Sequence, residues 1–285
     1  MSRVSTLPPE PVRDDRLAEV FDARVVPGYW GPFARRLVES LSDRILGNAR
    51  VLELGCATGT MTVELARVVP EGRIVAVDPR RTLLDRARDR AADLSGRRVF
   101  FKAEPPGRTS FADGAFDLVA ANLPFDTDAD PDAVLGEMRR VAAQGATVAL
   151  TVTLAGTWST VLDVYEEVVE RFEFPGAAER LAAVRARHVE PEDATRRVLL
   201  AGIDEVACDE FSFPIRFRNA RELFRDDLVA AGPLRDWKAV AGDDATWERA
   251  VFHLKGALDT YFASAEAIEV PVRGAVLIGR IGEGE

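Results

Sequence analysis

The chain has 285 residues, of which 47% are hydrophobic and 29% charged, a composition typical of soluble globular proteins. Lysine and arginine number 37 against 47 aspartates and glutamates, which leaves a formal net charge of −10. A field of that sign repels phosphate backbones, so a nucleic acid is not an expected partner. The length is long for one domain and short for two, which favours a single α/β domain with an insertion.

Cysteine usage and the apolar segments indicate a cytoplasmic protein. Cys56 and Cys208 are the only cysteines, too few for a disulfide framework or a cysteine metal site, which suits a reducing cytoplasm. Residues 1–15 have no apolar stretch that could serve as a signal peptide. The most apolar window, 141–154, is interrupted by a glutamine, a glycine and three threonines, so we expect no membrane span. The basic residues are almost all arginine, a bias that favours a GC-rich bacterial genome.

The first predicted elements form an N-terminal helical arm over residues 1–48. After a Pro-rich stretch at 7–12, the pattern predicts a helix over 15–23, a turn at 26–28 and a second helix over 32–46. The second helix carries one apolar stripe, which should pack on the core: Phe33, Leu37, Leu41 and Ile45.

From Arg50 onward, apolar strands alternate with helices. The predicted strands are 51–54, 73–78, 98–102, 116–121 and 146–154, and the helices between them are 60–69, 83–94 and 130–143. Near-continuous apolar strands separated by helices imply a parallel sheet covered on both faces, which is a Rossmann-like α/β fold.

The second half of the chain completes this sheet. Its predicted helices are 158–172, 177–188 and 191–201, and its predicted strands are 203–213 and 270–281. The sheet is then seven-stranded and mostly parallel. We assign residues 49–215 and 268–282 to a ligand-binding core and residues 216–267 to a helical cap inserted before the last strand.

The strongest motif is Val-Leu-Glu-Leu-Gly-Cys-Ala-Thr-Gly-Thr at residues 51–60. A strand that runs into a Gly-x-x-x-Gly turn and then a helix lets backbone amides approach a ligand, because glycine has no Cβ. For the same reason we expect a side chain at Gly59 to block the ligand more than the fold. A dinucleotide loop would have a third glycine where this chain has Thr62, and the carboxylate of Glu53 would repel a pyrophosphate. That carboxylate suits a ligand with an ammonium group.

This segment resembles motif I of the class I S-adenosylmethionine (SAM)-dependent methyltransferases, an acidic residue followed by x-Gly-x-Gly-x-Gly. Ala57 replaces the middle glycine, which keeps a close approach but loses freedom at positive φ. Residues 114–123 are similar to the fourth-strand motif of the same family. The resemblance covers about residues 26–215 and the last strand. It implies a single Rossmann-like domain that binds SAM and releases S-adenosylhomocysteine, and it does not identify the methyl acceptor.

The resemblance also implies which residues contact the cofactor. Asp78 ends the second strand, where a carboxylate can accept two hydrogen bonds from a ribose diol. The family has an acidic residue after the third strand that contacts the adenine, and here Glu104, or a backbone carbonyl, is expected to take that place. The complete set of expected cofactor-binding residues is Glu53, Gly55, Cys56, Ala57, Gly59, Asp78, Pro79, Glu104, Asn122 and Leu123.

Within the family, the chain resembles the small-molecule group that includes the ubiquinone and menaquinone C-methyltransferases, for example at Ala201-Gly202-Ile203. This implies a small, apolar or aromatic methyl acceptor. Two alternatives stay open. Asn-Leu-Pro-Phe at 122–125 also resembles the loop of amino-group methyltransferases, and a non-catalytic SAM-binding protein would carry the same motifs. We expect no metal site.

No catalytic base is identified, and the two candidates are His253 and Tyr29. His253 lies beside the core stripe of its predicted helix, where it would either pack or line a pocket. Tyr29 and Trp30 lie where the N-terminal arm of this family closes over SAM, so they either cover the site or anchor the core.

The predicted cap, over about residues 219–263, is rich in aromatic residues: Phe224, Trp237, Trp247, Phe252, Tyr261 and Phe262. The segment is too short to form its own core, so these rings must be buried elsewhere. We expect them to roof the mouth of the site beside Tyr29 and Trp30 and to admit only a small molecule. The competing interpretation is a dimer interface, and the sequence leaves both a monomer and a homodimer open.

Overall fold

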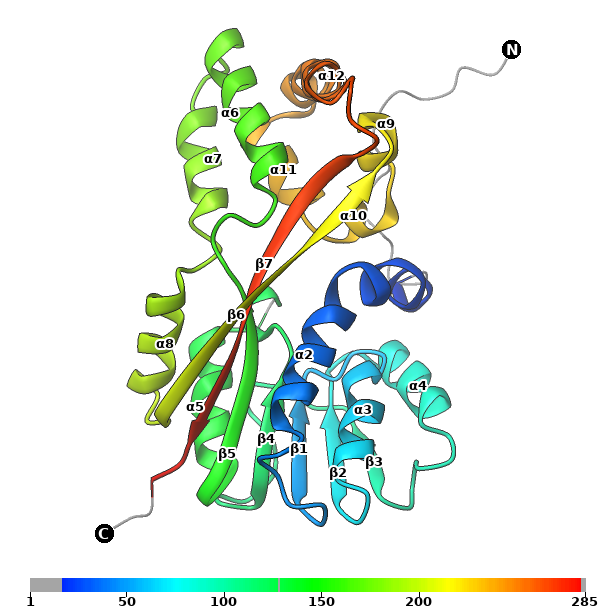
Figure 1. The fold of residues 1–285 in the computed structure, drawn as a ribbon, viewed down its shortest axis with the longest axis vertical. Coiled ribbons are helices and arrows are strands. Elements are labelled where there is room, and N and C mark those ends of the chain that lie inside the picture. Colours follow the sequence, from blue (N-terminus) through cyan, green and yellow to red (C-terminus); the bar gives the residue numbers. More distant parts are fainter. Residues whose placement is uncertain (1–16, 128, 283–285) are drawn as a thin grey trace. The chain divides into compact units, whose positions relative to one another are not determined.

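The computed structural model describes residues 17–127 and 129–282, which group into two compact units (Figure 1). The helical unit is made of the described residues up to Val25, residues 154–188 and residues 212–273. The sheet unit is made of residues 26–153, residues 189–211 and the described residues from Gly274 onward. The last two strands of the chain contribute residues to both units.

Seven strands form one sheet in the order β3-β2-β1-β4-β5-β7-β6. Their bounds are β1 Arg50–Leu54, β2 Arg73–Val77, β3 Val99–Lys102, β4 Phe116–Ala121, β5 Ala142–Thr153, β6 Asp204–Phe217 and β7 Ile268–Arg280. Strands β1 to β5 pair in parallel with their neighbours, and β7 runs antiparallel to β5. The predicted Rossmann-like, mostly parallel sheet is confirmed.

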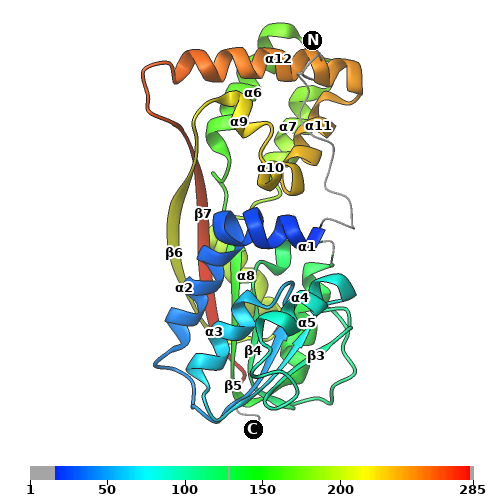
Figure 2. The same cartoon turned by 90° about the vertical axis from the view of Figure 1, so that its right-hand side faces the viewer.

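Helices cover both faces of this sheet, as Figure 2 shows with α2 and α3 on one side and α5 on the other. The helices of the sheet unit are α2 Gly31–Leu41, α3 Thr60–Val68, α4 Arg81–Arg90, α5 Pro131–Val141 and α8 Pro191–Leu200. Leu37 and Leu41 of α2 are buried against Leu65 of α3 and against Val51 and Leu118 of the sheet. The predicted apolar stripe of α2 therefore packs on the core.

The N-terminal arm differs from the prediction, because the turn expected at residues 26–28 is absent. Helix α1 (Leu17–Val20) continues into a π-helical segment, η1 (Phe21–Trp30), which leads directly into α2. Pro27 lies inside this segment and has no N–H to donate to a helical hydrogen bond. The turn of a π-helix is wider than that of an α-helix and accommodates this residue. A Cβ at Gly31 would lie 2.6 Å from the Val26 carbonyl oxygen, so glycine allows this close approach. The Pro-rich stretch at 7–12 lies outside the described residues.

The predicted cap is helical, and it clusters with residues 154–188, which the sequence analysis assigned to the ligand-binding core. The remaining helices of the helical unit are α6 Ser159–Phe172, α7 Ala177–Arg185, α9 Ala220–Leu223, α10 Asp227–Ala231, α11 Leu234–Ala241 and α12 Asp244–Tyr261. Within residues 17–127 and 129–282, every helix is too short or too polar to cross a lipid bilayer.

Trp237 of α11 lies at the centre of the aromatic core of the helical unit. Its ring centroid is 5.6 Å from that of Trp158 and 6.0 Å from that of Phe224, and its carbonyl accepts a 3.1 Å hydrogen bond from the Tyr165 hydroxyl. Trp247 packs on the same Phe224 ring. Helix α6 and the cap together bury Phe224, Trp237 and Trp247. The premise that burial of these three rings requires the mouth of the ligand site is therefore wrong.

Replacing Trp237 by alanine should lower the free energy of unfolding by about 3–5 kcal/mol, because it leaves a large cavity in this aromatic core. Urea unfolding followed by circular dichroism measures the loss. Phe252→Ala is the matched control, since the Phe252 residue is 72% exposed and its removal should change little. Equal stabilities for the two variants would contradict a packed core in the helical unit.

Candidate functional site

The expected cofactor-binding residues lie mostly at the carboxyl edge of the sheet. In the parallel register, Leu54 of β1 lies beside Val77 of β2 and Ala121 of β4. The segments that follow these three residues therefore meet at one edge. In open α/β sheets, ligands bind outside the carboxyl ends of the strands.

The loop at residues 55–59 is held against β2 by three backbone donors. The amides of Gly55 and Cys56 both donate to the Val77 carbonyl oxygen, at 2.8 and 2.9 Å. The Ala57 amide donates to Oδ2 of Asp78 at 3.1 Å. Gly55, Ala57 and Gly59 all have positive φ, and Ala57 adopts it at 47° although alanine disfavours this region. The loop is thus bent so that its amides face the end of β2.

The two glycines of the loop serve different purposes. A Cβ at Gly55 would have no heavy atom within 4 Å, so space is open beside this residue. A Cβ at Gly59 would lie 2.9 Å from the Cβ of Ala87 in α4. The missing side chain of Gly59 therefore leaves room for helix α4, and the expectation that Gly59 also leaves room for the ligand stays a prediction. Gly55 is the loop glycine beside which the structure leaves open space.

Arg90 of α4 also fixes this loop, a role that the sequence analysis missed. Its Nη1 donates to the Thr58 carbonyl oxygen at 2.6 Å, to Thr58 Oγ1 at 2.9 Å and to Thr60 Oγ1 at 2.6 Å. Arg88 pairs with Asp85 on the surface, as alternating charges at helical spacing suggest. The charge pattern alone could not separate Arg90 from its neighbours.

Glu53 is buried at 1% exposure and accepts a 2.5 Å hydrogen bond from the Thr62 hydroxyl. Burial and the charge of Asp78 raise the pKa of Glu53 to about 8, although the bond from Thr62 acts in the opposite direction. Burial and the same two carboxylates also raise the pKa of the Cys56 thiol. Cys56 therefore stays protonated rather than nucleophilic.

Asp78 is fully buried and accepts hydrogen bonds at both oxygens. Besides the Ala57 amide, the donors are the Arg80 amide at 2.9 Å and the Arg80 Nε and Nη2 atoms, each at 3.0 Å. A carboxylate has about four acceptor sites, so the guanidinium of Arg80 occupies the places a ribose diol would need. The Arg80 side chain is 42% exposed, which allows it to move away. Pro79 lies between them and is exposed.

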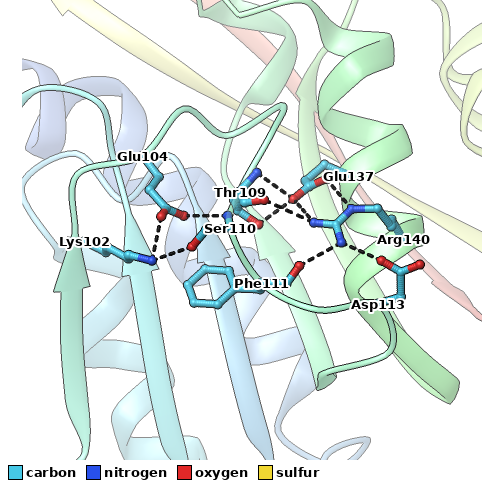
Figure 3. Close-up of polar contacts among 8 residues, drawn as sticks. All are labelled: Lys102, Glu104, Thr109, Ser110, Phe111, Asp113, Glu137 and Arg140. Carbon is cyan, nitrogen blue, oxygen red and sulfur yellow. Dashed lines mark hydrogen bonds and ion pairs between the residues drawn. The ribbon is translucent and has the colours of Figure 1, made fainter.

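Glu104 is engaged by its own loop, as Figure 3 shows. Lys102 Nζ lies 2.6 Å from one carboxylate oxygen, and the Ser110 amide donates to the other at 3.0 Å. Partial burial would raise the pKa of Glu104, but the bonds from Lys102 and Ser110 outweigh it and lower the pKa. Its carboxylate thus fastens the loop that follows β3.

The same loop is held at its far end by α5 (Figure 3). Glu137 accepts the Thr109 amide at 2.7 Å and pairs with Arg140 Nη2 at 2.6 Å. Arg140 in turn donates to the Phe111 carbonyl oxygen at 2.7 Å and pairs with Asp113 at 2.6 Å. The loop between β3 and β4 therefore has a fixed course along the sheet edge.

The Asn122 side chain is buried and makes structural hydrogen bonds. Its Oδ1 accepts from the Thr151 hydroxyl at 2.8 Å, and its Nδ2 donates to the Trp30 carbonyl oxygen at 3.2 Å. Leu123 has a φ of 52°, and its amide donates to the same Thr151 hydroxyl at 2.8 Å. The Arg197 guanidinium lies over the Phe125 ring, 4.9 Å from its centroid. The Asn122 amide thus joins the N-terminal arm to β4 and β5.

Tyr29 is buried, and its ring packs on Phe33 at a centroid distance of 5.5 Å. Its hydroxyl lies 2.9 Å from Thr153 Oγ1 and 3.3 Å from Asp126 Oδ2. Burial and the charge of Asp126 raise the pKa of Tyr29 well above its ordinary value. The phenol therefore keeps its proton near neutral pH and donates a hydrogen bond to Asp126.

His253 belongs to the helical unit, where its ring stacks on Phe172 with centroids 3.6 Å apart. It lines a surface groove of about 1440 Å³ formed by residues of that unit, and none of the expected cofactor-binding residues lines this groove. The contact with Phe172 is a packing contact. In the described part of the chain, no group of three or more histidine, cysteine, aspartate or glutamate residues could hold a metal ion.

Comparison with known proteins gives one family match: a family model described as a methyltransferase domain matches residues 45–174. A malonyl-[acyl-carrier protein] O-methyltransferase of Halorhodospira halophila is 31% identical over 206 residues, 70% of this chain and 63% of that protein. A demethylmenaquinone methyltransferase of Roseiflexus castenholzii is 35% identical over 100 residues, 35% of this chain and 41% of that protein. The chain thus spans less than two thirds of the length of either relative.

Among solved structures, the YcgJ protein of Bacillus subtilis is similar with a TM-score of 0.58 and 14% identity. The match covers 89% of this chain and 100% of that protein. At this identity the likeness concerns the fold.

Replacing Gly59 by alanine should destabilise the fold by about 1–3 kcal/mol, because the new Cβ meets Ala87 and the residue needs positive φ. Gly55→Ala has the same φ strain but no clash, so it should lose less stability. Urea unfolding compares the two ligand-free variants, and calorimetry measures their SAM binding. Equal destabilisation would mean that contact with α4 does not matter.

Glu53→Gln should change how stability depends on pH. The folded state holds a proton on Glu53 up to about pH 8, whereas the unfolded carboxyl ionises near its ordinary pKa of 4.5. The contribution of the Glu53 carboxyl to the free energy of unfolding is therefore complete below pH 4.5, and it is lost as the pH rises towards 8. Glutamine cannot ionise, so the variant should be more stable than the natural protein at pH 9 by a few kcal/mol and about equal near pH 5.

Urea unfolding at the two pH values measures this difference. The control is Glu64→Gln, because Glu64 forms a partly exposed ion pair with Arg67. This variant should not change the pH dependence of stability in this way. Parallel profiles for Glu53→Gln and the natural protein would show that the Glu53 carboxyl titrates normally.

Proposed function

Because its methyltransferase domain makes the chain a member of the class I SAM-dependent methyltransferases, we propose that it transfers a methyl group from SAM to a small acceptor molecule. S-adenosylhomocysteine is the second product. The single observation that carries this proposal is the loop at the end of β1, where buried Glu53 precedes Gly55 and its open space. A buried carboxyl beside an open glycine suits the ammonium group of an amino-acid ligand.

The residues at this edge fit SAM in three respects. The open space at Gly55 allows a ligand to reach the backbone of the loop. The carboxyl of Glu53, whose pKa is raised to about 8, gains a counter-charge from a bound ammonium and would ionise when it binds. Asp78 can accept a ribose diol once the Arg80 guanidinium has moved away. Glu104 would contact the adenine only if a bond to the adenine replaced its bond to Ser110 or to Lys102.

The cofactor supplies an electrophilic methyl group on a sulfonium when it is bound. The chain's own residues provide position: the bond between Ala57 and Asp78 fixes the loop, and Asn122 fixes Trp30 at the end of β4. Holding two reactants in line removes most of the entropic barrier of a bimolecular displacement. Tyr29 donates a hydrogen bond and takes no proton, because its pKa is raised. His253 stays a candidate base whose contact with Phe172 favours packing.

We further propose that the acceptor is a small molecule with an apolar or aromatic body. The likeness to a demethylmenaquinone methyltransferase supports this class, although it covers 35% of the chain. Methylation of an amine held by the Asn122 amide is less well supported, because that amide already bonds Thr151 and Trp30. A SAM-binding protein without catalysis would bind the same cofactor. Incubation with SAM and a panel of candidate acceptors distinguishes it from a methyltransferase, because only the methyltransferase releases S-adenosylhomocysteine.

Calorimetry with SAM, S-adenosylhomocysteine and NAD tests the cofactor. Asp78→Ala should weaken SAM binding by about 1–3 kcal/mol, through loss of hydrogen bonds from the ribose diol. Arg80→Gln should bind SAM at least as tightly as the natural protein, because it removes the guanidinium that competes for Asp78. Tight NAD binding with no heat from SAM or its product would refute the proposed function.

A further inference from the structure

The surface groove of the helical unit is formed mainly by residues of α6, α9 and α12 (Figure 1). Its volume is about 1440 Å³, and none of the expected cofactor-binding residues lines it. Pockets for small molecules have volumes of about 300–1,000 Å³. The groove is therefore larger than a metabolite needs, and its size suits a segment of polypeptide chain.

Aromatic rings in this groove are left largely uncovered by the fold. Phe252 is 72% exposed and Tyr261 is 57% exposed. The Phe252 ring contacts that of His253, which stacks in turn on Phe172. Aromatic residues are enriched at protein interfaces, where a partner completes their burial. The groove thus presents an apolar strip on which the apolar side chains of a partner can pack.

Two arginines of the groove are held against aromatic rings. The guanidinium carbon of Arg171 lies 5.7 Å from the centroid of the Phe172 ring, and that of Arg249 lies 5.3 Å from the centroid of Phe174. A guanidinium that contacts a ring through its face keeps the N–H donors of its plane for a carboxylate. Both arginines are exposed residues, so a partner can reach them.

Positive charge exceeds negative charge along the groove, although the chain as a whole has a net charge of −10. In the described part of the chain, no carboxylate lies within ion-pair distance of the Arg171, Arg221 or Arg249 guanidinium. Glu167 already accepts a hydrogen bond from the Tyr261 hydroxyl. Five cationic residues and two glutamates line the groove: Arg171, Arg221, Arg225, Arg249 and Lys255, with Glu167 and Glu248.

Like charges lie close together where α9 meets α12. Burial and the charges of Arg225 and Arg221 lower the pKa of Lys255, and the charge of Asp259 acts in the opposite direction. An anionic group bound in the groove would reduce this repulsion. The electrostatics of the groove therefore favour a negatively charged partner.

Charge and shape distinguish the possible occupants. In a two-fold dimer the same patch meets itself, which would bring these cations face to face. An anionic membrane is flat, and the net charge of −10 opposes its approach. A helix with carboxylates beside its apolar face complements both the arginines and the exposed aromatic rings.

We propose that this groove is a docking surface for an acidic amphipathic helix of a partner protein. The apolar face of that helix covers Phe252 and Tyr261, and its carboxylates pair with Arg171 and Arg249. The groove belongs to the helical unit and contains none of the expected cofactor-binding residues. The inference therefore goes beyond the proposed methyl transfer and does not depend on it.

Fluorescence anisotropy with the full chain tests this docking surface. The probes are two labelled helical peptides with the same apolar face of leucines, one with glutamate and the other with lysine on its polar face. The natural protein should bind the glutamate peptide more tightly by about tenfold or more, and added salt should reduce this preference. The double variant Arg171→Glu, Arg249→Glu should abolish the preference. The double variant Arg171→Lys, Arg249→Lys keeps both charges and should retain most of it.

Two further variants separate the charged contact from the apolar one. Phe252→Ala should weaken binding of the glutamate peptide severalfold, because it removes the most exposed ring of the groove. Arg235→Glu reverses the charge of an exposed arginine of α11 that does not line the groove, so this matched control should bind as the natural protein does. Circular dichroism shows which variants are folded.

Equal affinity for the two peptides, or no binding of either, would overturn the proposal. So would a preference for the glutamate peptide that persists in the folded Arg171→Glu, Arg249→Glu variant. Flotation with phosphatidylglycerol vesicles and sedimentation of the natural protein test the other occupants. Vesicle binding, or self-association that Phe252→Ala removes, would assign the groove to a membrane or to a second copy of the chain if neither peptide binds.

Discussion

The attachment of the Gly55–Gly59 loop to the end of β2 is the constraint on which the rest of the site depends. Two amides donate to the Val77 carbonyl oxygen, and the Ala57 amide donates to Asp78. These bonds hold Ala57 at positive φ, a conformation that alanine alone would not favour. The position of Asp78, and with it any ribose contact, follows from the same bond that shapes the loop.

Two buried carboxyl groups lie beside this loop, and the chain stabilises them in different ways. Asp78 accepts hydrogen bonds from the Arg80 guanidinium and from backbone amides. Glu53 has a hydroxyl partner in Thr62, and its pKa is raised to about 8 by burial and by Asp78. A cationic ligand would relieve the cost of both buried groups, whereas an anionic ligand would increase it. The electrostatics of the loop therefore oppose a dinucleotide pyrophosphate.

The helical unit has its own aromatic core, which changes how the cap should be understood. Trp237 and Trp247 pack with Phe224 and with Tyr165 of α6, so their burial needs no other partner. A cover over the ligand site stays a prediction, but it no longer follows from the need to bury these rings. Phe252 and Tyr261 of this unit are exposed, and their contacts are local: the Tyr261 hydroxyl donates to Glu167 of α6, and the Phe252 ring contacts that of His253.

Local pattern was enough to predict most of the fold and to place three of the candidate cofactor-binding residues at the ends of strands. Apolar strands that alternate with amphipathic helices specify a parallel sheet, and Glu53, Gly55 and Asp78 stand at strand ends whatever the details of packing. Contacts between distant segments were decided only by tertiary structure. Gly59 faces Ala87, and Tyr29, Asp126 and Thr153 come from three separate segments. Sequence periodicity reports which face of an element is buried, but it does not report which side chain lies opposite, because that depends on how the elements pack.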